Sequence, residues 1–184
     1  ISILTNLGAN IGDLSFGSST TLINAKTLNI QCADLNNDGK SEILLSKTGT
    51  VSNVVYYLKN ISDAASISFE SPVALNLDGS TARRIEVADL NLDGKPDIIV
   101  SNQTNNKVNI FKNVSSASTI DFDASPITFE VSGISNSAGL KVKDLNNDKL
   151  PDIAISPYLS SNIYILKNKS TSNTIDFDAS TPVS

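Results

Sequence analysis

The chain has 184 residues, of which 40% are hydrophobic and 18% are charged, and its formal net charge is −5. This length and apolar share suffice for a buried core in one domain, and they exclude a disordered chain. No basic stripe is present to neutralise phosphates, and no stretch comes near the roughly 18 apolar residues of a membrane helix. We therefore expect neither nucleic-acid binding nor membrane insertion.

The residue types that the chain lacks exclude several kinds of site. There is no histidine, which excludes Ser-His and Cys-His catalysis within the chain. Cys32 is the only cysteine, so the chain forms neither an internal disulfide nor a cysteine metal cluster. Because Cys32 lies in an apolar stretch, we expect its thiol to be buried and inert. The chain also has no methionine, so we expect a processed or excised piece of a longer protein.

In chain order, the first predicted strand is a short β-type run at 1–6 that ends in asparagine. Similar runs, each ending in asparagine, recur at 55–60, 108–113 and 163–168. Further β-type runs follow at 20–24, 72–76 and 126–131. Runs that lead into an acidic segment lie at 28–33, 84–88 and 140–143, and apolar runs leave it at 42–45, 97–100 and 152–155. Short runs bounded by Gly, Ser, Asn and Asp, with no helical periodicity, predict an all-β fold.

The acidic segments share one frame of nine residues, at 34–42, 89–97 and 144–152. Their first positions, 34, 89 and 144, lie 55 residues apart both times, which indicates a tandem repeat. In the second segment, oxygen-bearing side chains occupy positions one, three, five and nine, and Gly94 occupies position six. A hard cation such as Ca²⁺ takes about six to eight oxygen ligands, so these side chains and the carbonyl at position seven predict a calcium loop.

Position six of the frame is expected to need a left-handed backbone. Gly39 and Gly94 adopt such a backbone freely, whereas Lys149 of the third segment adopts it at a cost of roughly 1–2 kcal/mol. We therefore expect the third calcium loop to bind least well.

The acidic segments have two other possible interpretations, an EF-hand and a simple turn. An EF-hand needs a bidentate acid at position twelve, where this chain has Leu45, Val100 and Ile155, so helix-flanked calcium loops are excluded. Alternatively, Asp- and Asn-rich turns could simply connect strands, since these residues favour turns. Three copies in one frame favour the metal loop.

A unit of about 55 residues with four short strands is typical of one blade of a β-propeller. The predicted division is a partial blade at 1–26 and blades at 27–79, 80–134 and 135–184, with the completeness of the last left open. We expect about three and a half four-stranded antiparallel blades, forming either an arc of a larger propeller, which we favour, or a pair with a second copy. Open blade edges are expected to promote self-association.

The stretch VADLNLDGKPDIIVSN (87–102), followed by KVNIFKN (107–113), resembles the bacterial FG-GAP/VCBS repeats, with echoes at 33–60 and 143–168. These repeats are related to the calcium-binding blades of the integrin α-subunit propeller. The resemblance implies three Ca²⁺ sites, in which position seven contributes its carbonyl. The implied ligands are Asp34, Asn36, Asp38, Lys40 and Glu42, then Asp89, Asn91, Asp93, Lys95 and Asp97, and finally Asp144, Asn146, Asp148, Leu150 and Asp152.

The expected function is that of a non-catalytic, calcium-binding propeller module for adhesion or protein–protein interaction at the cell surface. We expect a secreted bacterial protein whose ligand is a protein or a glycan. Two alternatives stay open, namely a lectin-like propeller and an accessory domain of a secreted polysaccharide-degrading enzyme. Tyr158 could stack on a sugar ring, although local packing is the default for a loop tyrosine.

Asn60, Asn102, Asn113 and Asn168 all match the N-glycosylation pattern. Asn60, Asn113 and Asn168 share one position of the repeat, so we interpret them as turn asparagines inherited by duplication. We expect these side chains to stay unmodified.

Overall fold

The computed structural model describes residues 1–5, 16–23, 26–47, 54–77, 81–132, 136–158, 160–178 and 181–183. Residues 6 and 24, which end two of the predicted strands, lie outside this part of the chain. Every regular element of the described residues is a strand, so the predicted all-β class is confirmed. The described part of the chain contains no helix that could span a membrane.

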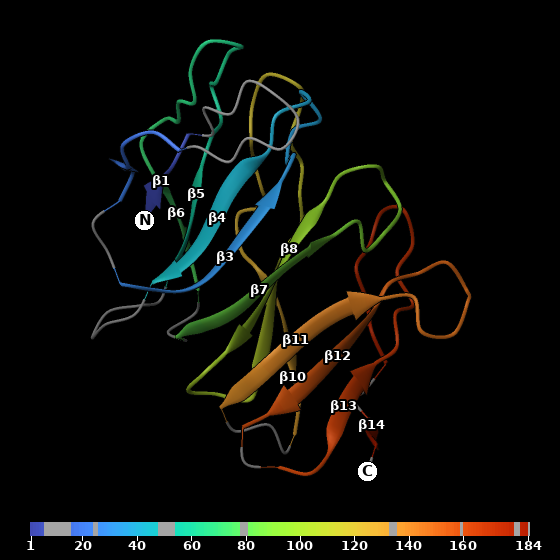
Figure 1. Ribbon diagram of the computed structural model, residues 1–184. Coiled ribbons are helices and arrows are strands. Elements are labelled where there is room, and N and C mark those ends of the chain that lie inside the picture. The colour runs from blue at the N-terminus through green and yellow to red at the C-terminus, as the bar shows by residue number, and fades with distance from the viewer. Residues whose placement is uncertain are drawn as a thin grey trace.

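Twelve of the strands form three antiparallel sheets of four, which we name blades 1, 2 and 3 (Figure 1). Blade 1 consists of β3 (Thr27–Ala33), β4 (Glu42–Lys47), β5 (Val54–Leu58) and β6 (Val73–Asn76). Blade 2 consists of β7 (Ala82–Ala88), β8 (Asp97–Asn102), β9 (Lys107–Phe111) and β10 (Ile127–Glu130). Blade 3 consists of β11 (Ser137–Lys143), β12 (Asp152–Pro157), β13 (Ile163–Leu166) and β14 (Thr181–Val183). In each blade the strands pair in chain order.

A separate two-stranded sheet precedes blade 1. It consists of β1 (Ser2–Ile3) and β2 (Thr20–Thr21). Ile1 and Ile3 pack against a small buried cluster of blade 1 made by Ile43, Leu45 and Leu58. This sheet therefore covers part of the outward face of blade 1.

The first strands of the three blades lie side by side, β3 next to β7 and β7 next to β11 (Figure 1). Hydrogen bonds join these neighbours. The amide of Ile85 donates to the side-chain oxygen of Asn29 (2.8 Å), and the Arg84 side chain donates to the carbonyl of Ala138 (2.8 Å). Sheets stacked in this way, with their first strands adjacent, are the blades of a partial β-propeller.

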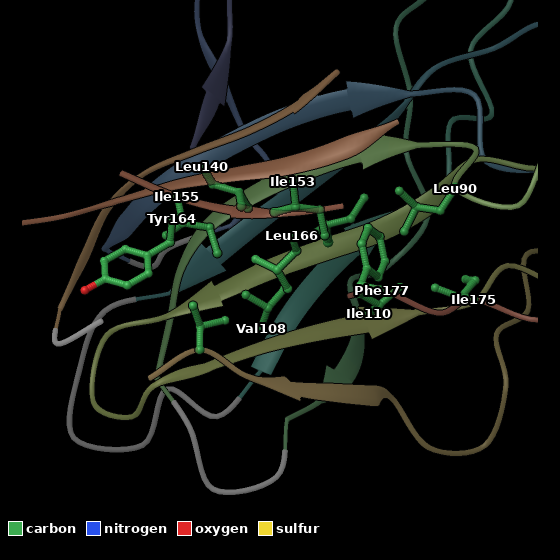
Figure 2. Close-up of a cluster of buried hydrophobic side chains, with 12 residues drawn as sticks. Leu90, Val108, Ile110, Leu140, Ile153, Ile155, Tyr164, Leu166, Ile175 and Phe177 are labelled. Atoms are coloured by element: carbon green, nitrogen blue, oxygen red, sulfur yellow. The ribbon is translucent and has the colours of Figure 1, made fainter. Parts of the chain in front are cut away.

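The hydrophobic core lies between the blades. One cluster fills the interface of blades 1 and 2, and a second fills that of blades 2 and 3. Ile98 belongs to the first cluster and Ile99 to the second, because successive side chains of β8 point to opposite faces of the sheet. Figure 2 shows the second cluster, in which Val108 and Ile110 of blade 2 lie close to Leu166 and Phe177 of the third repeat. The unbroken apolar run of β8 is thus buried on both faces.

The expectation of a buried Cys32 is wrong, because this thiol is exposed. Along β3 the exposed side chains alternate with half-buried ones, and Leu28, Ile30 and Cys32 share the exposed face. An apolar run does not reveal whether one face of its strand or both faces will be covered. Here one face of β3 has no full sheet above it.

Candidate metal centre

The three acidic loops join the first strand of each blade to its second strand and lie at the same end of the sheets (Figure 1). The first loop touches the second, since the side-chain amide of Asn37 donates to the carbonyl of Gly94 (2.9 Å). Position seven, occupied by Lys40, Lys95 and Leu150, lies two residues before the second strand in every blade. The repeated frame of the sequence therefore becomes a repeated loop in space.

The left-handed backbone predicted at position six is confirmed in all three loops. The φ angles are 86° at Gly39, 84° at Gly94 and 78° at Lys149. A Cβ built on either glycine would have no atom within 4 Å, so the backbone conformation itself is what favours glycine there.

Position four is also left-handed, and this was not predicted from the sequence. Asn37, Leu92 and Asn147 have φ angles of 58°, 57° and 64°. The asparagines at two of the three positions could have predicted this backbone, because asparagine tolerates the left-handed region better than most residues.

The aspartates at positions one and five shape each loop by accepting backbone hydrogen bonds. In the second loop, Asp89 accepts from the amides of Asp93 (3.1 Å) and Gly94 (2.8 Å). Asp93 accepts from the amide of Lys95 (3.0 Å). The first loop repeats this pattern with Asp34 and Asp38. In the third, Asp144 accepts from Asn146, Asn147 and Lys149, and Asp148 accepts from Leu150. These two aspartates thus stabilise the same turn in all three loops.

The acid at position nine lies at the base of the loop and is buried. In the second loop, Asp97 is fully buried and accepts from the amides of Leu90 (3.0 Å) and Asn113 (2.9 Å). Burial raises the pKa of Asp97 to about 6, although both hydrogen bonds act in the opposite direction. Burial also raises the pKa of Glu42, the corresponding acid of the first loop. In the third loop, Asp152 accepts from the backbone amides of Leu145 and Asn168, the counterparts of Leu90 and Asn113.

The asparagine at position three distinguishes the first two loops from the third. The side-chain oxygens of Asn36 and Asn91 are buried and accept no hydrogen bond from the described residues. Asn146 is exposed instead, and its side-chain oxygen accepts from the amide of Asp148 (2.9 Å). A buried carbonyl-type oxygen without a donor, in an amide that contacts the carboxylate of position five, suits a hard cation.

The predicted ligands do not form a purely acidic cluster. In the described part of the chain, no three acidic side chains converge as a metal-binding group. The reason is that the acid at position nine turns towards two backbone amides, while the other two acids face the loop. A cation in the first or second loop would therefore have mixed carboxylate, amide and carbonyl ligands.

An asparagine that follows the third strand of blades 2 and 3 connects neighbouring loops to one another. The side-chain amide of Asn113 donates to the carbonyl of Pro96 in its own blade and to that of Leu35 in the preceding loop, both at 2.8 Å. Asn168 repeats this arrangement with Pro151 and Leu90. The shared repeat position was the sequence signal, but the link between blades was not predicted. Both side chains are buried, so their amide nitrogens are not accessible for glycosylation in the folded chain.

Tyr158 lies far from these loops and is 63% exposed. The guanidinium of Arg83 lies over its ring, 5.9 Å from the centroid. One face of this aromatic ring is therefore already in contact with a cation.

Stacked four-stranded blades, each with an acidic loop between its first and second strands, define a repeat protein of the propeller class. The family model described as FG-GAP-like repeat matches the chain twice, over residues 34–100 and 89–155. The chain belongs to the FG-GAP-like repeat family. A search of curated proteins found none that matches it.

Proposed function

We propose that this chain is a calcium-stabilised propeller module that works outside the cell in adhesion or protein–protein interaction, without catalysis of its own. Membership of a propeller repeat family supports the interaction role. One observation carries the calcium proposal: the side-chain oxygens of Asn36 and Asn91 are buried and accept no hydrogen bond from the described residues. Loops of this kind suit the millimolar calcium found outside cells.

The carboxylate distribution also supports calcium. Nine of the 19 acidic residues belong to the three loops. Without a cation, neighbouring carboxylates repel one another and oppose folding. Three Ca²⁺ ions would change the formal net charge from −5 to about +1. Outside the loops, Asp176 and Asp178 lie near each other, but both are exposed and pair with Lys169, which supports a non-catalytic role.

The experiment is a thermal melt of the full chain with calcium and with chelator, repeated for Asn91→Ala and for the matched control Asn146→Ala. Calcium should raise the melting midpoint, because a cation bound only by the folded state adds about 2.7 kcal/mol at a hundredfold excess over Kd. Asn91→Ala should reduce this shift, whereas Asn146→Ala should change it less, since the Asn146 oxygen is already hydrogen-bonded within its loop. A melting midpoint that is the same with calcium and with chelator would overturn the calcium proposal.

A lectin is the second candidate function, and the exposed Tyr158 with its neighbouring Arg83 favours it. An aromatic ring beside a cationic side chain could hold a sugar carrying an acidic group. A glycan array with the wild-type chain and Tyr158→Ala separates the candidates. Binding that Tyr158→Ala removes would support the lectin, whereas an array without signal would leave protein–protein interaction as the proposed role.

A further inference from the structure

The small sheet β1–β2 corresponds to the third and fourth strands of a blade. The amide of Gly17 donates to the carbonyl of Thr5 (2.8 Å), as the amide of Glu70 donates to that of Lys59 in blade 1 (2.9 Å). In blades 1 to 3 the third strand pairs on both edges, with the second and the fourth strand. Among the described residues β1 pairs only with β2, so one edge of β1 is open.

The exposed face of β3 lies where the first two strands of such a blade would pack. Ile30 is 49% exposed, whereas its repeat counterparts Ile85 and Leu140 are 1% and 4% exposed. Ile85 shares its cluster with Leu35 and Leu44, which belong to the first hairpin of the preceding blade. A hairpin formed by a first and a second strand therefore contributes side chains to the cluster that buries an Ile30-type residue.

Asn60 indicates what the loop of that hairpin must contain. Its side-chain amide donates to the carbonyl of Ser41 (2.8 Å), which is the bond within its own blade. Its counterparts Asn113 and Asn168 donate a second bond to the carbonyl at position two of the preceding acidic loop. No described residue supplies this carbonyl to Asn60, so an acidic loop in the same geometry would complete its hydrogen bonds.

We propose that blade 1 carries a docking site for a β-hairpin of the acidic-loop class, similar in form to β7–β8. The hairpin would extend the sheet at the open edge of β1, cover Leu28, Ile30 and Cys32, and present a loop carbonyl to Asn60. Three separate features point to this one occupant. They are the open edge of β1, the exposed apolar face of β3, and the Asn60 side-chain amide, which donates only one of the two hydrogen bonds that its counterparts donate. A second copy of the whole chain does not suit the site, because β1 and β2 already lie on this face. The proposal does not depend on the calcium proposal.

The test places a copy of residues 81–107 directly before Ile1 as a tethered hairpin. This junction keeps the repeat register, because Lys107 precedes Val108, the repeat counterpart of Ile1. The added segment contains no cysteine, so Cys32 remains the only thiol and reports directly on whether the face is covered. We expect alkylation of Cys32 by a maleimide to be at least tenfold slower than in the original chain.

Two variants of the hairpin-bearing chain show where the hairpin lies. Ile30→Asp should restore fast alkylation, whereas the matched control Ile163→Asp should leave it slow. Ile163 is 48% exposed, nearly the same as Ile30, but it lies on blade 3. Asn60→Ala should speed alkylation severalfold while the circular dichroism spectrum stays unchanged.

An alkylation rate that is the same with and without the hairpin would overturn the proposal. So would slow alkylation that persists in both Ile30→Asp and Asn60→Ala. If the original chain instead shows alkylation that slows as its concentration rises, a second copy covers the face and the assigned occupant is wrong.

Discussion

At the scale of single residues, the backbone of the acidic loops explains why the three repeats are not equivalent. The first two loops have glycine at the left-handed sixth position, and the third has Lys149 with φ of 78°. A lysine in this region is destabilised because its Cβ crowds the backbone carbonyl. In the third loop the side-chain oxygen of Asn146 also accepts a hydrogen bond from the backbone amide of Asp148, so it is less available to a cation. Both features place the weakest of the three proposed calcium sites in blade 3.

Lys149→Gly should therefore stabilise the chain and improve the third site. We expect the free energy of unfolding to rise by up to about 1 kcal/mol, after allowing for the greater chain entropy of unfolded glycine. Calcium affinity of this site should tighten by up to about tenfold, which corresponds to 1.4 kcal/mol. Urea denaturation and calorimetry measure the two effects. Gly94→Lys is the reverse control and should weaken the second loop, and a Lys149→Gly chain that binds calcium less well would contradict the backbone argument.

Asp97 should make the metal-free chain sensitive to pH. Its pKa is raised by burial from 3.8 to about 6, so the folded state holds this proton more tightly than the unfolded state. The resulting stabilisation is complete below about pH 4 and is lost as the pH rises through 6, with a magnitude of about 3 kcal/mol at most.

Urea denaturation of the metal-free chain between pH 4.5 and roughly 7.5 measures this contribution. Asp97→Asn should flatten the fall in stability across this range. Glu42 shifts in the same direction and remains in both proteins, so the comparison isolates Asp97. Identical slopes for the two proteins would show that Asp97 does not titrate in this way.

At the scale of the strands, the interfaces between the blades differ at one position of the fourth strand. Phe129 of β10 packs edge-on against Phe177 of blade 3, with ring centroids 5.3 Å apart. The register places Leu75 of β6 at the corresponding position, since both residues pair with a valine of the third strand. A groove of about 290 Å³ lies beside Leu75 and is lined by Phe122, the counterpart of Phe177. The smaller side chain leaves this space open.

Leu75→Phe should fill the groove and form an aromatic pair with Phe122. We expect the free energy of unfolding to rise by about 0.5–1.5 kcal/mol, the usual range for such a pair. Urea denaturation measures the change, and Ala74→Phe, whose side chain points to the opposite face of β6, is a control that should give no gain. A less stable Leu75→Phe chain would mean that the groove is too tight for the ring and that overpacking dominates.

At the scale of the whole molecule, the far face of blade 3 is an apolar surface that blades 1 and 2 bury at their own interfaces. Leu145 is 52% exposed, whereas its counterparts Leu35 and Leu90 are fully buried. Ile163 is exposed in the same way, and its counterpart Val108 is buried. Apolar surface of this kind promotes association.

We therefore expect the chain to self-associate through this face as its concentration rises. Light scattering across a concentration series measures the average mass. Leu145→Asp combined with Ile163→Asp should shift the chain towards monomer, because a charge on the face opposes its burial. A strict monomer at every concentration would show that this face remains solvated.

The sequence by itself determined the repeat and everything that follows from local chemistry. The spacing of 55 residues between positions 34, 89 and 144 predicted the blades, because each acidic loop turns the chain between its first and second strands. Residue types also predicted the left-handed sixth position, since this conformation depends only on the backbone and its own Cβ. Such features need no knowledge of distant parts of the chain.

The tertiary structure alone decided what the repeats do to one another. Cys32 has an apolar neighbourhood in sequence, yet it is exposed because no complete sheet covers its side of β3. Asn113 reaches back 78 residues to the carbonyl of Leu35, and the Asn91 oxygen is left without a donor by the packing around it. These outcomes depend on which face of one blade meets the next. The identity of a residue and its near neighbours does not determine that contact.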